Sequence, residues 1–286
     1  MRSIGVIARL TLREAVRRKV VWGLLLLGVV FLTLYALGLV LIQREVAGLP
    51  RNAVPARIGG INAIYNFFVM AALYAANFLI VMLAVLISVD TLAGEISSGT
   101  VQSIAVKPLR RRDIVMGKWL GFVALLALCT ILLVGGVLLV TLVVTHYLPP
   151  NPWSGLLLMF LEALVFLSVS LLGGTRLSTL ANGVLGFGLF GLAFIGAFVE
   201  QIGGFIEQYG ASGGTTAIQI GHLASLIMPS EVLWRRALAD MAEGLNPIRM
   251  MTIGASTPDN SVIGYAVIYA AIILLLAVFS FQRRDL

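Results

Sequence analysis

Charged residues are scarce in this sequence of 286 residues. Asp, Glu, Lys and Arg make up 12% of the chain, about half of the roughly 25% that is usual in soluble proteins. A soluble fold of this size needs more charged side chains to cover its surface. The single cysteine, Cys129, excludes a secreted scaffold built on disulfides, and the 59% hydrophobic content excludes intrinsic disorder. The composition therefore indicates a polytopic membrane protein.

Sequence motifs for nucleotide or metal chemistry are also missing. The one Gly-Lys pair, Gly117-Lys118, lacks the Ser or Thr and the glycine spacing of a P-loop, and no H-E-x-x-H occurs. The two histidines, His146 and His222, lie far apart, which favours surface or interface histidines over a metal site. We therefore expect no catalytic residue, no metal and no cofactor in this chain, so any energy that its activity needs comes from elsewhere.

Apolar runs long enough to cross a bilayer occur six times. A helix needs about 20 apolar residues to span the hydrocarbon core. The sequence therefore predicts an all-α, polytopic membrane protein that forms a single domain over residues 1–286. The six expected spans are residues 20–42, 64–89, 119–145, 154–172, 179–199 and 262–281.

The distribution of Lys and Arg predicts the orientation of the chain. Fourteen of the 20 lie before span 1, between spans 2 and 3, between spans 4 and 5, or in the C-terminal tail, and six lie on the other side. By the positive-inside rule, both termini face the cytoplasm and the protein lies in the cell membrane. The basic residues flank spans instead of forming one patch, so they give no reason to expect a nucleic acid partner.

Residues 2–19, before the first span, have the pattern of an amphipathic helix. Ile4, Ile7 and Leu10 share a broad apolar face, while Arg9 and Arg13 are four residues apart on another. This pattern is typical of a helix that lies in the membrane interface with its arginines towards lipid head groups. Ordinary positive-inside flanking of a span is the alternative.

The segment between spans 2 and 3, residues 90–118, is longer than a turn requires. One stripe with a spacing of four residues consists of Leu92, Ile96, Thr100 and Ile104. A second, polar face consists of Glu95, Ser98 and Gln102. Pro108 ends or kinks this helix. The pattern predicts a short amphipathic helix beneath the membrane, and a solvated loop that only reverses the chain is the alternative.

The residues of this segment resemble the cytoplasmic signature of type-2 ATP-binding-cassette (ABC) permeases. Within that superfamily they are most similar to the group associated with multicopper-enzyme maturation and related exporters. The similarity is specific over about 30 residues, and the six-span plan extends it less specifically over the whole chain. The residues that carry it are Asp90, Gly94, Glu95, Ser98, Gly99, Thr100, Lys107, Pro108, Arg111, Ile114, Gly117, Lys118 and Gly121.

The resemblance implies a function for two segments. Residues 90–118 would contain the coupling helix, which contacts a separate cytoplasmic ATPase subunit that binds ATP and Mg²⁺. The segment before span 1 would be the interfacial elbow helix. Carried over by position, the residues at the ATPase contact would be Glu95, Ser98, Gly99, Thr100 and Gln102. The resemblance also implies a second permease subunit, identical or a paralogue, within the lipid membrane.

Residues 201–261, on the outer side, are too numerous for a structureless connection. Residues 217–228 read as one apolar helix, and Pro229 breaks it. Ser230 can cap a second amphipathic helix over 231–243. Such short helices before the last span either dip into the outer leaflet and cap a vestibule, or form an external hairpin without a role in transport.

Two polar or small-residue features lie within the spans. Glu162 is the single acidic residue deep in a span, where a charge is costly. It is a candidate residue of the translocation path. Alternatively it is a structural glutamic acid, hydrogen-bonded to a neighbour such as Asn66 or Asn77. Gly117 and Gly121 at the start of span 3 are typical of close helix packing.

Together these features predict the membrane subunit of an ATP-driven transporter, and the resemblance implies an exporter. The first alternative is a secondary transporter or channel that works without an ATPase. It favours several intramembrane ionisable groups and an inverted repeat, whereas we find one carboxylate and no evident repeat. The second is an integral membrane enzyme, which needs a cluster of His, Asp, Glu or Cys at one membrane depth.

Overall fold

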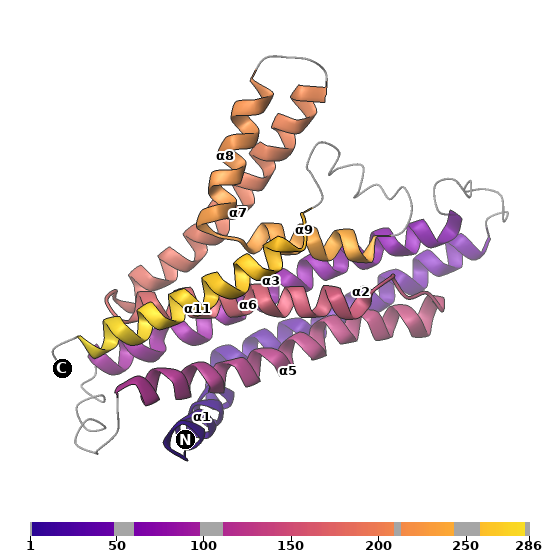
Figure 1. Ribbon diagram of the computed structural model, residues 1–286. Coiled ribbons are helices and arrows are strands. Elements are labelled where there is room, and N and C mark those ends of the chain that lie inside the picture. The colour runs from indigo at the N-terminus through magenta and orange to yellow at the C-terminus, as the bar shows by residue number, and fades with distance from the viewer. Residues whose placement is uncertain (1, 49–59, 98–110, 209–212, 243–257, 284–286) are drawn as a thin grey trace.

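All the elements in the described part of the chain are helices. The computed structural model describes residues 2–48, 60–97, 111–208, 213–242 and 258–283 (Figure 1). The helices are α1 (Arg2–Arg17), α2 (Lys19–Ala47), α3 (Gly60–Ser97), α5 (Arg111–Thr145), α6 (Pro152–Gly174), α7 (Thr179–Gln208), α8 (Gly214–Ile227), α9 (Ser230–Met241) and α11 (Ser261–Gln282).

Six of these helices are long and apolar enough to cross a membrane: α2, α3, α5, α6, α7 and α11. They contain the six apolar runs of the sequence, so the six-span expectation is confirmed. Several helices extend further than the runs. The helix α3 continues beyond Val89 to Ser97, and α5 begins at Arg111. The reason is that apolarity marks the part of a helix in hydrocarbon, whereas polar turns at each end remain helical.

The helices α3 and α6 form the centre of the bundle. In α6, 67% of the most apolar stretch is buried, and in α3 the share is 61%, compared with 11% in α2. Fully buried side chains include Val69 and Ile80 of α3 and Met159 and Leu167 of α6. The exposed surface of α2 is itself apolar, as Leu26 and Leu34 show. The polar features of α3 and α6 are therefore the ones shielded from lipid.

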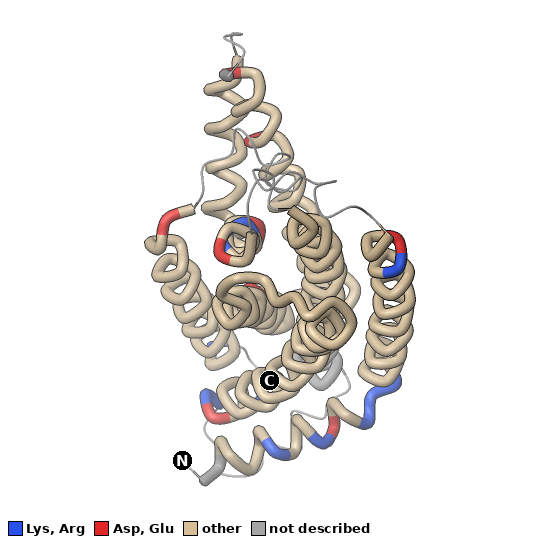
Figure 2. The backbone as a smooth tube through the Cα atoms, turned by 90° about the vertical axis from the view of Figure 1, so that its right-hand side faces the viewer, with Lys and Arg blue, Asp and Glu red and all other residues tan. Residues whose placement is uncertain are grey.

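One end of the bundle gathers five chain segments. The junction of α1 and α2, the end of α3, the start of α5, the turn between α6 and α7, and the end of α11 all lie there (Figure 1). We call this the α1 end. Figure 2, which looks along the bundle, shows α1 lying across it instead of running parallel to the spans. The arginines Arg9, Arg13 and Arg17 of α1 are exposed, as the amphipathic pattern predicts.

The helix α1 packs closely on the first turns of α5. A Cβ atom added at Gly121 would lie 2.7 Å from the Ala8 carbonyl oxygen, and one at Gly117 would lie 2.6 Å from the Ile7 Cβ atom. Both distances are too short for real atoms. The interpretation of these two glycines as packing residues is therefore confirmed, and their partner is the helix that precedes the spans.

We expect Gly121→Leu to lower the thermal midpoint of the purified protein by roughly 3–10 °C, because overpacking costs about 1–3 kcal/mol. The midpoint is measured by size-exclusion chromatography after heating. Gly135→Leu on the same helix is the matched control, since a Cβ atom at Gly135 meets nothing within 4 Å. Equal midpoints for the two variants would show that α1 does not pack on α5 as described.

The helices α7 and α8 form a hairpin that diverges from the other spans (Figures 1 and 2). Small residues allow the close approach of its two arms. A Cβ atom at Gly203 would lie 2.7 Å from the Gly214 carbonyl oxygen, and Gly196 faces Ala224. Of the glycines earlier in α7, Gly186 packs on Val85 of α3. Helix packing through small residues is thus found on this span too.

The two short helices expected before the last span are present as α8 and α9. The apolar side of α9 is confirmed: Leu233, Trp234, Ala237 and Met241 are buried. The sequence predicts that Ser230 caps α9, and this prediction is wrong. Ser230 is the first helical residue, and Pro229 occupies the cap position without a side-chain hydrogen bond. Proline is tolerated here because the first amide groups of a helix have no intrahelical partner.

Candidate functional site

Glu162 lies at the centre of the bundle and is buried from solvent. It lies near the middle of α6 and its relative exposure is 2%. The amide nitrogen of Asn77 on α3 donates a hydrogen bond of 2.9 Å to the Glu162 Oε2 atom. Of the two partners that the sequence allowed, the structure therefore selects Asn77. Asn66 instead donates to the Tyr147 hydroxyl and to the Met241 carbonyl, each at 2.9 Å.

The Asn77 side chain is only half satisfied. Its Oδ1 atom is buried and accepts no hydrogen bond in the described part of the chain. A buried polar atom without a partner costs about 1–3 kcal/mol, so this acceptor is a destabilising feature next to the one acidic group deep in the bundle. Buried acceptors without a protein partner occur at functional sites and at sites that hold a water molecule.

The helix α9 covers this polar pair from the side away from the α1 end. The Trp234 ring of α9 contacts the Tyr74 ring of α3, with 5.3 Å between centroids. Asp240 of α9 accepts a short hydrogen bond from Ser154 of α6. With the bond from Asn66 to Met241, these contacts join α9 to both central helices. The helix α9 therefore packs over the α3–α6 centre.

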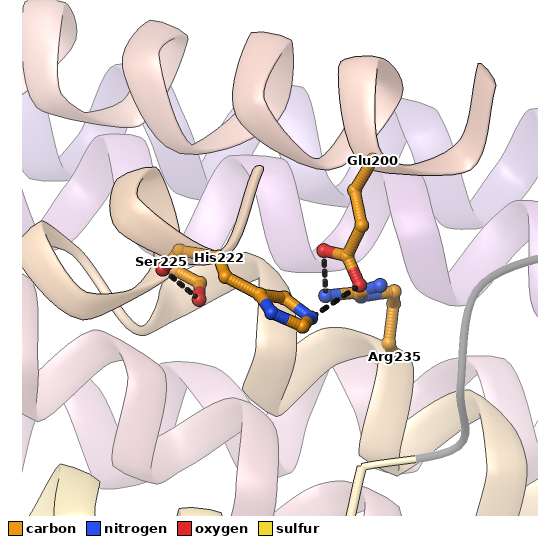
Figure 3. Close-up of polar contacts among 4 residues, drawn as sticks. All are labelled: Glu200, His222, Ser225 and Arg235. Carbon is orange, nitrogen blue, oxygen red and sulfur yellow. Dashed lines mark hydrogen bonds and ion pairs between the residues drawn. The ribbon is translucent and has the colours of Figure 1, made fainter. Parts of the chain in front are cut away.

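A charged cluster holds the α7–α8 hairpin to α9. The Arg235 Nη2 atom of α9 donates to the Glu200 Oε2 atom of α7 at 2.8 Å. The His222 Nε2 atom of α8 lies 3.4 Å from the Glu200 Oε1 atom (Figure 3). The Glu200 and Arg235 side chains are 3% and 10% exposed, whereas that of His222 is 58% exposed. One carboxylate thus joins three helices.

Sequence reasoning did not find this cluster. Glu200 lies between the predicted span 179–199 and the outer segment 201–261, so the sequence analysis gives it no role. Its partner Arg235 is 35 residues away in the sequence. The periodicity of a helix or strand predicts only contacts between residues a few positions apart, so it cannot reveal this pair. His222 is a partly exposed interface residue, in agreement with the preferred interpretation of the histidines. In the described part of the chain, no three His, Cys, Asp or Glu residues gather as metal ligands.

Glu231 at the start of α9 belongs to the same electrostatic neighbourhood. Burial raises the pKa of its carboxyl group to about 7, with a further rise from the nearby Glu200 and an opposing effect from Arg235. The charge of Glu231 also acts on Glu162 and Tyr74. A group that titrates near neutral pH therefore lies between the cluster around Glu200 and the carboxyl group of Glu162.

The raised pKa of Glu231 predicts that stability falls as pH rises. The folded state binds the Glu231 proton more tightly than the unfolded state does. The contribution of this group to stability is therefore complete below pH 4.5 and is lost as pH rises through 7. We expect the thermal midpoint to fall by roughly 3 °C or more between pH 5 and pH 8. Glu231→Gln should remove most of this change and His222→Gln should retain it. If His222→Gln alone removes it, the assignment to Glu231 is wrong.

The residues expected at the ATPase contact lie at the α1 end or outside the described residues. Glu95 lies in the last turn of α3, which the sequence expected to end at Val89. Ser98, Gly99, Thr100 and Gln102 fall outside the described residues. The contact therefore stays a prediction. Glu95, the first of its residues, lies on α3 at the α1 end of the bundle.

Comparison with known families identifies the chain. A family model described as ABC-2 family transporter protein matches residues 6–286, which is nearly the whole sequence. No curated protein matches the sequence significantly. The match covers all six candidate spans, both short helices and α1 from Val6 onward. This chain is therefore a member of the ABC-2 family of transporter membrane proteins.

Proposed function

We propose that this chain is the permease subunit of an ABC exporter in the cytoplasmic membrane and that a separate ATPase subunit drives it. The observation that carries the proposal is the family match over residues 6–286, on a bundle with six candidate spans. The lack of a P-loop motif in the sequence supports a separate motor. ATP and Mg²⁺ would bind to that partner and not to this chain.

The proposed assembly contains two permease subunits, identical or paralogous, and two ATPase subunits. The excess of Lys and Arg at the α1 end supports an orientation with both termini in the cytoplasm. The helix α1 would be the elbow helix, and its exposed Arg9, Arg13 and Arg17 support a place at anionic head groups. The signature around residues 90–121 supports the multicopper-enzyme-maturation group within the family.

The coupling step would begin where α3 leaves the membrane. In this proposal, Glu95, Ser98, Gly99, Thr100 and Gln102 form the surface that the ATPase subunit contacts. The helix α3 is continuous from Gly60 to Ser97, so a displacement of its α1 end can be transmitted along the whole helix. Transmission requires a helix that moves as one element between two packed arrangements.

Glu162 is the candidate residue of the translocation path. Its bond to Asn77 joins the helix that receives the movement, α3, to the most buried helix, α6. A shift of α3 along α6 would separate the two groups and expose the carboxyl group to a path between the helices. The unpaired Asn77 Oδ1 atom supports this proposal, since one state leaves it without a partner and another can supply one.

Co-purification tests the proposal directly. The tagged chain is extracted from the membranes of its own host in a mild detergent, and bound proteins are identified by mass spectrometry. We expect an ABC ATPase in near-stoichiometric amount and ATP hydrolysis by the complex. An unrelated tagged membrane protein from the same host is the control. Recovery of the chain without an ATPase, together with transport by the chain alone, would instead support a secondary transporter or channel.

A further inference from the structure

We infer that the α1 end of α11 binds the phosphate head group of an anionic phospholipid, with an acyl chain along the adjacent face of the helix. A hollow of about 340 Å³ lies between the α6–α7 turn and the end of α11, and its lining is Thr175, Arg176, Ser280 and Arg283. The site itself does not depend on the proposed function. Only its assignment to the cytoplasmic leaflet depends on the proposed orientation.

The polar groups of the hollow are held in place by one another. The Arg176 Nε atom donates to the Ser280 Oγ atom at 3.1 Å, and the Thr175 and Ser280 hydroxyl oxygens are 2.9 Å apart. Thr175 is buried and also donates to the Leu172 carbonyl oxygen at 2.7 Å. The terminal nitrogens of Arg176 make no hydrogen bond to the described residues. The guanidinium group is thus fixed through Nε and presents its other N–H groups to the hollow.

Arg283 supplies a second positive charge. Its Cζ atom lies 4.2 Å from the centroid of the Phe279 ring. Stacking on an aromatic face orients a guanidinium group and leaves the N–H groups at its edge available. Neither Arg176 nor Arg283 has a carboxylate partner within the part of the chain that the structure describes. Two arginines without an acidic partner among the described residues match the charge of a phosphate group.

The face of α11 next to Arg283 is entirely apolar. A second hollow, of about 350 Å³, is lined by Ile272, Leu275, Leu276, Val278 and Phe279. Phe279 thus lines the apolar hollow and also carries the Arg283 guanidinium group. From Ile272 to Arg283 the helix rises about 16 Å, close to the roughly 15 Å of hydrocarbon in one leaflet. The apolar stripe and the arginines therefore match the length of one lipid from acyl chain to head group.

Charge favours a lipid over a second copy of this chain at this surface. A two-fold symmetric contact through the same patch would place the arginine pairs against each other. An anionic head group neutralises them, and basic pockets between helices at the cytoplasmic side are suited to such lipids. Exposed Leu275 and Leu276, at 66% and 48%, remain available for the acyl chain.

Native mass spectrometry of the purified full-length chain, with any subunits that accompany it, tests the inference. The probes are phosphatidylglycerol and phosphatidylcholine with the same acyl chains. We expect phosphatidylglycerol to bind at least about tenfold more tightly. The double variant Arg176→Gln/Arg283→Gln should lose this preference, and Leu275→Asn/Leu276→Asn should weaken the binding of phosphatidylglycerol. All four positions are at the surface or partly exposed, so the variants are expected to fold.

Lys19→Gln/Arg112→Gln, at the starts of α2 and α5, is the matched control, because it removes two exposed basic residues at the same end without touching the hollow. It should keep the preference for phosphatidylglycerol. Equal loss in this control and in Arg176→Gln/Arg283→Gln would show general surface attraction and overturn the site. Equal binding of both lipids would also overturn it. Full competition by inorganic phosphate, with no effect of the leucine changes, would show a site for soluble anions and contradict the proposed lipid.

Discussion

Gly99→Pro is expected to leave the ATPase subunit bound and active while movement of the span helices stops. Proline at the centre of the proposed coupling helix removes a backbone N–H group and costs about 3 kcal/mol in a helix interior. That change distorts the surface which receives the ATPase movement. Position 99 lies outside the six candidate spans, so the substitution should not affect insertion into the membrane. Glu95→Ala should have the same effect in weaker form, because it removes one polar contact and no backbone bond.

Spin labels on the central helices measure this prediction. Ala71→Cys on α3 and Leu157→Cys on α6 are exposed positions near the end opposite to α1, and the single native cysteine, Cys129, is buried. In the complex with the ATPase, ATP and Mg²⁺ should shift the distance between labels in the parent protein. In Gly99→Pro the shifted population should fall about tenfold or more. A normal shift in both Gly99→Pro and Glu95→Ala would show that this segment is not the coupling helix.

Glu162→Gln is expected to assemble normally and to alter transport or its stimulation by ATP. Glutamine keeps an oxygen that accepts the Asn77 hydrogen bond, but it cannot ionise. If the carboxyl group lines the path, we expect substrate-stimulated ATP hydrolysis to change at least about tenfold, because an interaction with a charged group contributes about 1.5–3 kcal/mol. The measurement is the rate of ATP hydrolysis by the reconstituted complex, with and without candidate substrates.

A pair of apolar variants separates a structural role from a transport role. Glu162→Leu alone removes the one hydrogen bond that Asn77 makes to the described residues and should destabilise the protein by about 1–3 kcal/mol. The double variant Asn77→Leu/Glu162→Leu removes both polar groups, so most of that stability should return. Turnover should stay low in the double variant. Parent-level turnover by Glu162→Gln, or by the double variant, would show that Glu162 is only structural.

The sequence predicts the spans and the short amphipathic helices because each depends on the local sequence: the spans on the length of apolar runs, and the amphipathic helices on helical periodicity. Hydrocarbon thickness defines an apolar run, and the apolar side of α9 follows from the helical repeat of Leu233, Trp234, Ala237 and Met241. The close approach at Gly117 and Gly121 was also predictable, since two small residues four apart permit close packing. Its partner, α1, was not, because many helices can occupy such a surface.

The polar contacts between helices depend on tertiary packing and escape sequence reasoning. Asn66 and Asn77 were equal candidates for Glu162, and only the register of α3 against α6 selects Asn77. The bond from Arg235 to Glu200 depends on the hairpin that folds α8 back along α7. The length of α3 was underestimated because residues 90–97 carry polar side chains that end a hydrophobic run without ending a helix.

Cysteine crosslinking between the segment after α3 and the ATPase subunit tests the central claim most directly. With Cys129 replaced by Ser, single Ser98→Cys and Gln102→Cys variants are treated in the purified complex with a short bifunctional thiol reagent. Ser225→Cys on α8, on the proposed outer side, is the control. The account predicts an ATPase crosslink from both positions 98 and 102 and none from position 225. Labelling of positions 98 and 102 by an impermeant thiol reagent from outside intact cells, without any crosslink to an ATPase, would contradict it.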